Sequence, residues 1–151
     1  MKIFLLLSIV FFSTSSLALC VNAEKANLRS KPSAKSRVTW VVERYMPLKR
    51  VKRKGAWLQV RDLDRKKHWI HRKLVTDNFR CAAVKVNRAN LRSGPGSKFK
   101  RTDLAYVRKY AAFKKMDRDD AWLKLRDNYG RTHWAHESTL WEALNYSRHT
   151  F

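Results

Sequence analysis

The chain contains the same short blocks twice, in the same order. Ala-Asn-Leu-Arg-Ser stands at 26–30 and again at 89–93, 63 residues later. Trp57–Asp62 has its counterpart at 122–127, and His68–His71 has its counterpart at 133–136, both 65 residues later. Such matched blocks indicate one structural unit copied in tandem, with about 52 to 58 residues in each copy, which is near the lower limit for an independent core.

The offsets also predict where the two copies differ in length. Tyr45 and Tyr110 lie 65 residues apart, as the later blocks do. The second copy therefore contains two additional residues between the positions of Ser30 and Tyr45. We expect the first copy to have lost them from the loop that follows Ser30, where it also lacks the glycines of Gly94-Pro95-Gly96.

Local patterns in both copies are typical of strands. In 57–61 and 122–126, apolar residues alternate with polar ones, which is the period of a half-buried strand. Val38–Val42 is rich in β-branched and aromatic residues. The best helix candidate is Glu137–Leu144, one or two turns long. The sequence thus predicts an all-β protein of two tandem small β-barrels, with five or six short strands in each.

The N-terminus predicts export. Lys2 precedes an apolar run at 3–12, and Ser16-Leu17-Ala18 offers small residues for cleavage, so residues 1–18 read as a cleaved signal peptide. The run is too short to span a bilayer, and no transmembrane span is expected. We expect a periplasmic or secreted protein with barrels at 19–78 and 79–144, and a C-terminal tail at 145–151.

Cys20 and Cys81 are the two cysteines of the chain. An exported protein meets an oxidising compartment, and the two residues lie just before and just after the first copy, so a disulfide is expected. It would close a loop of about 60 residues and stabilise the fold by roughly 4 kcal/mol. Two alternatives remain at this stage: cleavage after Ala23, which would remove Cys20, and lipidation of Cys20.

The repeated blocks resemble the bacterial SH3 (SH3b) domain. The resemblance rests on three motifs: an Asn-Leu-Arg-Ser-x-Pro opening, a tryptophan followed by alternating residues, and a closing strand with Trp-x-His. In the second copy they stand at 89–96, 121–127 and 133–136, and in the first copy at 26–33, 56–62 and 68–71. Within this frame we expect Leu28 and Leu91 to point inward. We also expect Arg29 to pair with Asp62, and Arg92 with Asp127.

One position departs from the family pattern in both copies. His68 and His133 stand where the family usually has glycine before the second tryptophan. A metal site is not expected from these strands, because residues three apart on a strand point to opposite faces and zinc needs three or four ligands. No catalytic domain accompanies the two copies, so neither an enzyme nor a cofactor is expected.

The resemblance implies a non-catalytic exported binding module whose partner is a cell-wall (peptidoglycan) peptide or an envelope protein. We expect a shallow groove made by the 31–37 and 94–101 loops together with the ligand-binding residues Tyr45, Trp57, Tyr110 and Trp122.

The net charge of +22 supports an alternative. Such a surface attracts anions, so the protein could bind nucleic acid or an anionic envelope polymer by charge alone. The predicted export signal makes nucleic acid the weaker of these two partners. Salt distinguishes the alternatives, because phosphate-driven affinity falls steeply as ionic strength rises.

Overall fold

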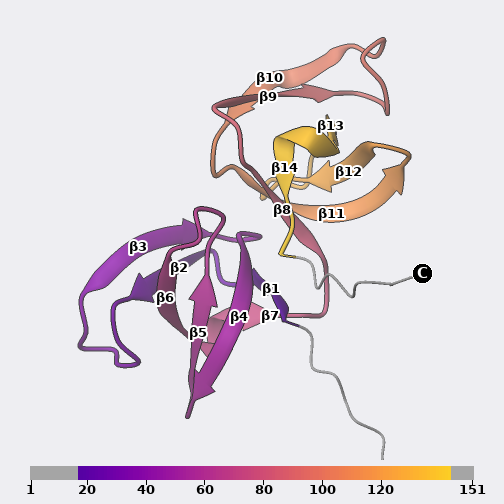
Figure 1. Cartoon of the computed structure of the whole chain (residues 1–151). Helices are drawn as coiled ribbons and strands as arrows, with labels where there is room; N and C mark the ends of the chain where they lie inside the picture. The colour runs from indigo at the N-terminus through magenta and orange to yellow at the C-terminus, as the bar shows by residue number, and fades with distance from the viewer. Residues whose placement is uncertain (1–16, 144–151) are drawn as a thin grey trace, which may run out of the picture.

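The computed structural model describes residues 17–143. The predicted signal peptide, apart from its last two residues, and the predicted tail lie outside this range. Figure 1 shows two β units that follow each other along the chain and lie against one another. The all-β prediction is confirmed.

The first unit consists of β1 (Ala18–Val21), β2 (Lys25–Arg29), β3 (Val38–Glu43), β4 (Pro47–Lys54), β5 (Trp57–Arg61), β6 (Lys67–His71), the 3₁₀ turn η1 (Arg72–Leu74) and β7 (Val75–Thr76). The second consists of β8 (Cys81–Val84), β9 (Arg88–Arg92), β10 (Arg101–Arg108), β11 (Ala112–Asp119), β12 (Trp122–Arg126), β13 (Thr132–His136), η2 (Glu137–Thr139) and β14 (Leu140–Trp141). In place of the expected helix, the chain makes only the turn η2 and then pairs as β14.

The two sheets have identical topology. Their hydrogen-bonded orders are β3-β2-β6-β5-β4-β1-β7 and β10-β9-β13-β12-β11-β8-β14, with antiparallel neighbours throughout. Each sheet is strongly curved (Figure 1), but its outermost strands are not paired with each other. The expected barrels are therefore open, with seven strands in each sheet rather than five or six.

Matched apolar residues form the two cores. Leu28 and its counterpart Leu91 are fully buried, which confirms that they point inward. The alternating residues of β5 and β12 bury Leu58, Val60, Leu123 and Leu125 in the same way. Ala83 of β8 packs into the core of the first unit, so the two cores are in contact.

The two additional residues lie in a strand and not in the loop. Arg29 faces Val38 in the first unit, and Arg92 faces Arg101 in the second, so the intervening loops have equal length. The register then shifts between Arg101 and Tyr106, where Ala105 adopts a φ of 50°. The insertion thus lies in an irregularity of β10, where the strand interrupts its antiparallel pairing with β9 to accommodate the additional residues. The predicted shortening of the first loop is wrong.

Gly94 is needed for space and not for a positive φ. Only Gly55 and Gly130, among the glycines described, have a positive φ. A Cβ on Gly94 would lie 2.4 Å from the Phe99 ring, which covers this loop. In the first unit, Lys31 is equivalent to Gly94 and Ser36 to Phe99. The large side chain at the second position is therefore present only where the first position is glycine.

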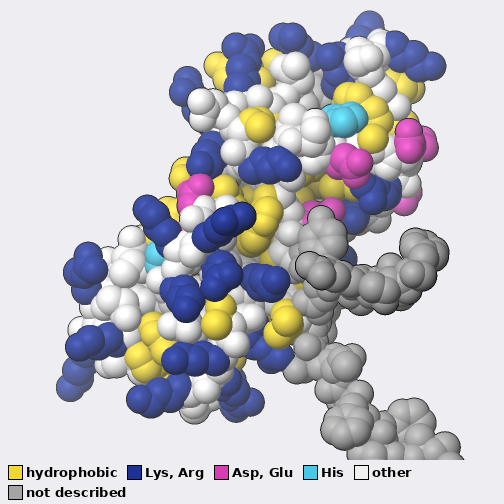
Figure 2. Space-filling model, in the orientation of Figure 1, with side chains coloured by type: hydrophobic (Ala, Val, Ile, Leu, Met, Phe, Trp, Pro, Cys, Tyr) yellow, Lys and Arg dark blue, Asp and Glu magenta, His cyan; other side chains and the backbone are white. Residues whose placement is uncertain are grey.

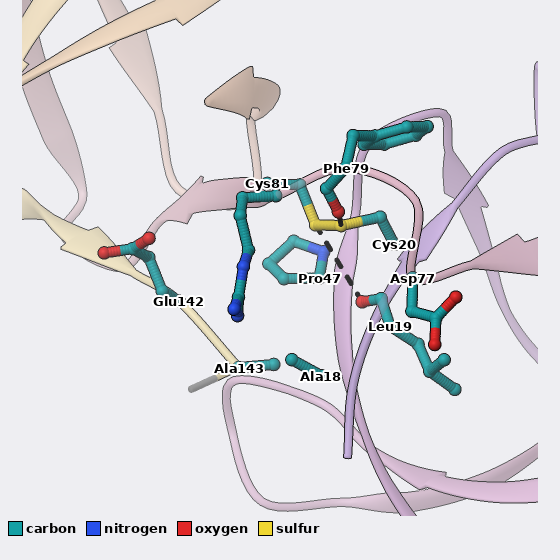
Figure 3. A pocket seen from close by; sticks show the side chains of 10 residues that line it. Ala18, Leu19, Cys20, Pro47, Asp77, Phe79, Cys81, Glu142 and Ala143 are labelled. Atoms are coloured by element: carbon teal, nitrogen blue, oxygen red, sulfur yellow. Dashed lines mark hydrogen bonds between the residues drawn. A yellow bond between two sulfur atoms is a disulfide. The ribbon is translucent and has the colours of Figure 1, made fainter. Parts of the chain in front are cut away.

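A disulfide joins the two units. Cys20 lies in β1 and Cys81 in β8, the first strand of each unit, and their sulfurs are bonded at 2.05 Å. Figure 3 shows this bridge beside Pro47 and Phe79, with Glu142 and Ala143 across a hollow of about 90 Å³. The predicted disulfide is present, but it connects the units rather than the two ends of the first.

Candidate functional site

Each unit contains a buried hydroxyl–imidazole–carboxylate chain. In the first, Thr39 Oγ1 lies 2.7 Å from His68 Nδ1, and His68 Nε2 lies 3.0 Å from Asp62 Oδ2. Because an ionised carboxylate only accepts hydrogen bonds, Nε2 carries the proton and donates it to Asp62. The Asp62 Oδ1 atom accepts the backbone N–H groups of Asp64 and Lys66, and this fixes the β5–β6 turn.

The second unit repeats the chain atom for atom. His133 Nδ1 lies 3.0 Å from Thr102 Oγ1, and His133 Nε2 lies 3.1 Å from Asp127 Oδ2. Asp127 Oδ1 accepts the backbone N–H groups of Tyr129 and Arg131. His133 is only 2% exposed. A group so enclosed, present in both copies, ties the turn to the sheet, and we assign it a structural role.

These carboxylates do not pair with the arginines expected from the sequence. Arg29 instead donates to the backbone oxygen of Ser36 at 2.7 Å, and Arg92 donates to that of Phe99 at 2.9 Å. Both arginines thus brace the loop after the first block. The pairing of His68 and His133 with the carboxylates was missed, although the same six-residue spacing from aspartate to histidine recurs in both copies and could have indicated it.

The two clusters differ at one side chain. Arg131 Nε donates to Asp127 Oδ2 at 2.8 Å. Burial raises the pKa of the Asp127 carboxyl, but the hydrogen bonds from His133 and Arg131 outweigh it and hold the pKa below its ordinary value. Lys66 takes the place of Arg131 in the first unit and donates only its backbone N–H to Asp62.

The predicted tryptophans form the same pair with a histidine in each unit. The ring centroids of Trp57 and His71 lie 5.3 Å apart at an interplanar angle of 82°, and those of Trp122 and His136 have the same distance and angle. His71 and His136 also cap η1 and η2, since each Nδ1 accepts a backbone N–H two residues later. Both tryptophans are partly exposed, as the sequence predicted.

A groove lies beside the tryptophan of the first unit. It has a volume of about 510 Å³, and Trp57, His71 and Ala34 line it together with Asn27 and Leu74 of the same unit. Three cations, Lys25, Arg29 and Lys73, stand at its walls. Ala34 belongs to the 31–37 loop, so the structure brings together the loop and the tryptophan that the sequence placed there.

The predicted tyrosines lie elsewhere, where the two units meet. Tyr110 donates its hydroxyl to Asp64 at 2.6 Å, and its ring meets Trp40 edge-on at 5.1 Å. Tyr45 meets Phe79 of the connecting segment edge-on at 5.6 Å. Both tyrosines have a positive φ, near 72° and 74°. The lining of the groove includes Trp57 and not Tyr45.

Asp64 forms the main polar contact between the units. Besides Tyr110, it accepts Lys109 Nζ at 2.8 Å. Hydrogen bonds from Lys109 and Tyr110 lower the pKa of the Asp64 carboxyl. A cavity of about 210 Å³ lies beside this contact, between Trp40, Lys66 and Tyr110. Tyr110 thus positions the second unit on the first.

Lysine and arginine cover much of the surface. Figure 2 shows them over both units, whereas most of the acidic side chains visible in this view lie over the second. Within residues 17–143 the structure has no group of three or more His, Cys, Asp or Glu side chains that could hold a metal ion. No helix in this range is long and apolar enough to cross a membrane.

The bacterial SH3 domain family matches residues 22–77 and 85–142. These ranges contain every strand of the two sheets except β1 and β8 and cover more than half of the chain, so the chain belongs to this family. No curated protein matches the chain.

Among solved structures, the chain is similar to NlpC1 from Trichomonas vaginalis, at 14% identity and a TM-score of 0.37, over 92% of this chain and 50% of that one. An NlpC/P60 family protein from Bacillus cereus has 13% identity and a TM-score of 0.38, over 83% of this chain and 56% of that one. The CBD of endolysin LysPBC5 has 14% identity and a TM-score of 0.34, over 88% and 98%. The chain thus spans about half the length of NlpC1.

Proposed function

We propose that this protein is an exported, non-catalytic module that binds a peptide of the bacterial cell wall. Membership of the bacterial SH3 family supports a binding role. The Cys20–Cys81 disulfide supports an oxidising, periplasmic or secreted location, because such bonds persist outside the cytosol. An envelope protein that displays a similar peptide is the alternative partner.

The groove at Trp57 carries the proposal. It combines an aromatic face with neighbouring cations and a volume suited to a short peptide. An exposed tryptophan edge provides large contact area at a small entropic cost, because its ring is already held by His71. In the second unit, the rings of Trp122 and His136 form a pair with the same geometry. Two weak sites on one chain strengthen retention on a polymeric wall.

The test is co-sedimentation of the mature protein with isolated cell walls at low and physiological salt. Trp57→Ala is expected to weaken wall binding at both salt concentrations, with a further loss when Trp122→Ala is added. Tyr129→Ala is the matched control, since this aromatic side chain is 85% exposed and does not line the groove. Binding that survives both tryptophan substitutions and disappears with salt would assign retention to charge alone.

A further inference from the structure

The two units carry opposite charges at the same end of the same fold. This end is formed by the tips of the β4–β5 and β11–β12 hairpins with the turns η1 and η2. In the first unit it presents five exposed cations: Lys52, Arg53, Lys54, Arg72 and Lys73. The equivalent residues of the second unit are Asp117, Arg118, Asp119, Glu137 and Ser138.

Matching hydrogen bonds show that these positions are equivalent in space. Arg53 Nε donates to the backbone oxygen of Gly55 at 2.8 Å, and Arg118 Nε donates to that of Asp120 at 3.0 Å. The backbone N–H of Arg72 donates to Ala56, and that of Glu137 makes the corresponding bond to Ala121.

The second unit shows what chemistry this position accommodates. Its Glu137 carboxylate forms an ion pair with the guanidinium of Arg118. Both side chains are about half exposed, so the pair contributes little to stability. It does show that a carboxylate reaches this arginine when the residue at the start of the 3₁₀ turn is acidic.

In the first unit both partners of the equivalent pair are arginines: Arg53 stands in the place of Arg118, and Arg72 in the place of Glu137. Within residues 17–143, no acidic side chain forms an ion pair with Arg53 or Arg72. Two guanidinium groups at positions that elsewhere make an ion pair leave a place for an external anion, and guanidinium forks match a carboxylate in geometry and charge.

This end of the first unit is continuous with the proposed peptide groove. Lys73, which follows Arg72 in η1, lines the groove with Trp57 and His71. In the sheet, Lys54 faces Trp57 and Trp57 faces His71. A peptide lying on Trp57 therefore passes beside the cationic turn.

We propose that the first unit binds an acidic peptide, with a carboxylate of the ligand held by Arg53 and Arg72 where Glu137 holds Arg118 in the second unit. This inference rests on the proposed function and specifies its ligand: a wall peptide with a free carboxylate. The second unit supplies its own carboxylate at this position and does not share the preference. The two units thus differ in ligand although they have the same fold.

The experiment measures binding by isothermal titration calorimetry to a soluble wall stem peptide, with its carboxylates either free or amidated. The native protein is expected to bind the free form about tenfold more tightly, the effect of one charge-assisted contact. Arg72→Glu, which gives the first unit the pair of the second, is expected to remove this preference. Arg72→Gln should reduce it, and Arg118→Gln, in the second unit, should leave it intact.

Equal affinities for the free and amidated peptides, or an unchanged preference in Arg72→Glu, would overturn the proposal. Inorganic polyphosphate is the third probe. If the protein binds this polymer tightly and binds the free and amidated peptides equally well, the cationic end is a general polyanion surface and the proposal is overturned. Sedimentation with Trp57→Ala tests the proposed function separately, since wall binding through the groove can persist when the carboxylate preference is absent. Circular dichroism confirms that each variant is folded.

Discussion

Replacing Asp127 by alanine tests the buried cluster of the second unit. The carboxylate accepts His133 Nε2 in the core, Arg131 Nε at the surface and two backbone N–H groups of the turn. Removal leaves the imidazole donor unpaired at a site that is 2% exposed, which costs about 1–3 kcal/mol. The lost hydrogen bonds to the exposed turn add about 1 kcal/mol in total, because water replaces the carboxylate there. We therefore expect Asp127→Ala to lower the free energy of unfolding by about 3 kcal/mol.

The assay is thermal unfolding followed by tryptophan fluorescence and circular dichroism. In a domain of this size, about 3 kcal/mol corresponds to a fall in melting temperature of more than about 10 °C. Asp62→Ala, which lacks an equivalent of the Arg131 bond, should cost slightly less, and exposed Asp119→Ala should change little. If Asp127→Ala and Asp119→Ala have the same stability, the cluster does not hold the turn and the structural assignment is refuted.

Three further predictions concern pH and the junction of the units. The folded-state pKa of Asp127 is lowered, so its contribution to stability should be complete above the ordinary carboxyl pKa of about 3.9. This contribution should be lost as the pH falls through the lower folded-state pKa. The free energies of unfolding of the native protein and of Asp127→Asn, measured against pH, should therefore converge in this acid range. Removing both cysteines, Cys20→Ser with Cys81→Ser, should lower stability by roughly 4 kcal/mol, and equal melting of native and variant protein would contradict this. Tyr110→Phe removes the hydrogen bond to Asp64, so it should increase motion between the units with little change in either core. NMR relaxation gives a rotational correlation time for each unit, and equal times for the two units of the variant would count against the prediction.

The fold was predictable because its main determinants are local and occur twice. Alternation at 57–61 and 122–126 predicted buried strands, and these are β5 and β12. The matched blocks predicted one topology in two copies, which the sheets confirm. The open edges were not predictable in this way, since closure depends on pairing between strands far apart in sequence.

The candidate site was only partly predictable, because side-chain partners are chosen in three dimensions. The sequence predicted a groove made by two loops with four aromatic residues; of these residues Trp57 lines a groove with Ala34 of the 31–37 loop, and its role in binding stays a prediction. Tyr110, in a comparable sequence context, instead serves the contact between the units through Asp64. The sequence also suggested arginine as the partner of Asp62, but His68 on the neighbouring strand lies closer and inside.

The bond between Cys20 and Cys81 has a consequence for resistance to proteolysis. A protease that cuts an exposed loop of the first unit, such as residues 30–37, severs the backbone between the two cysteines. The fragments remain covalently tethered through sulfur, so β1 and β2 stay close to the strands of the first sheet with which they pair. Release of the N-terminal fragment therefore requires a reductant as well as a nick.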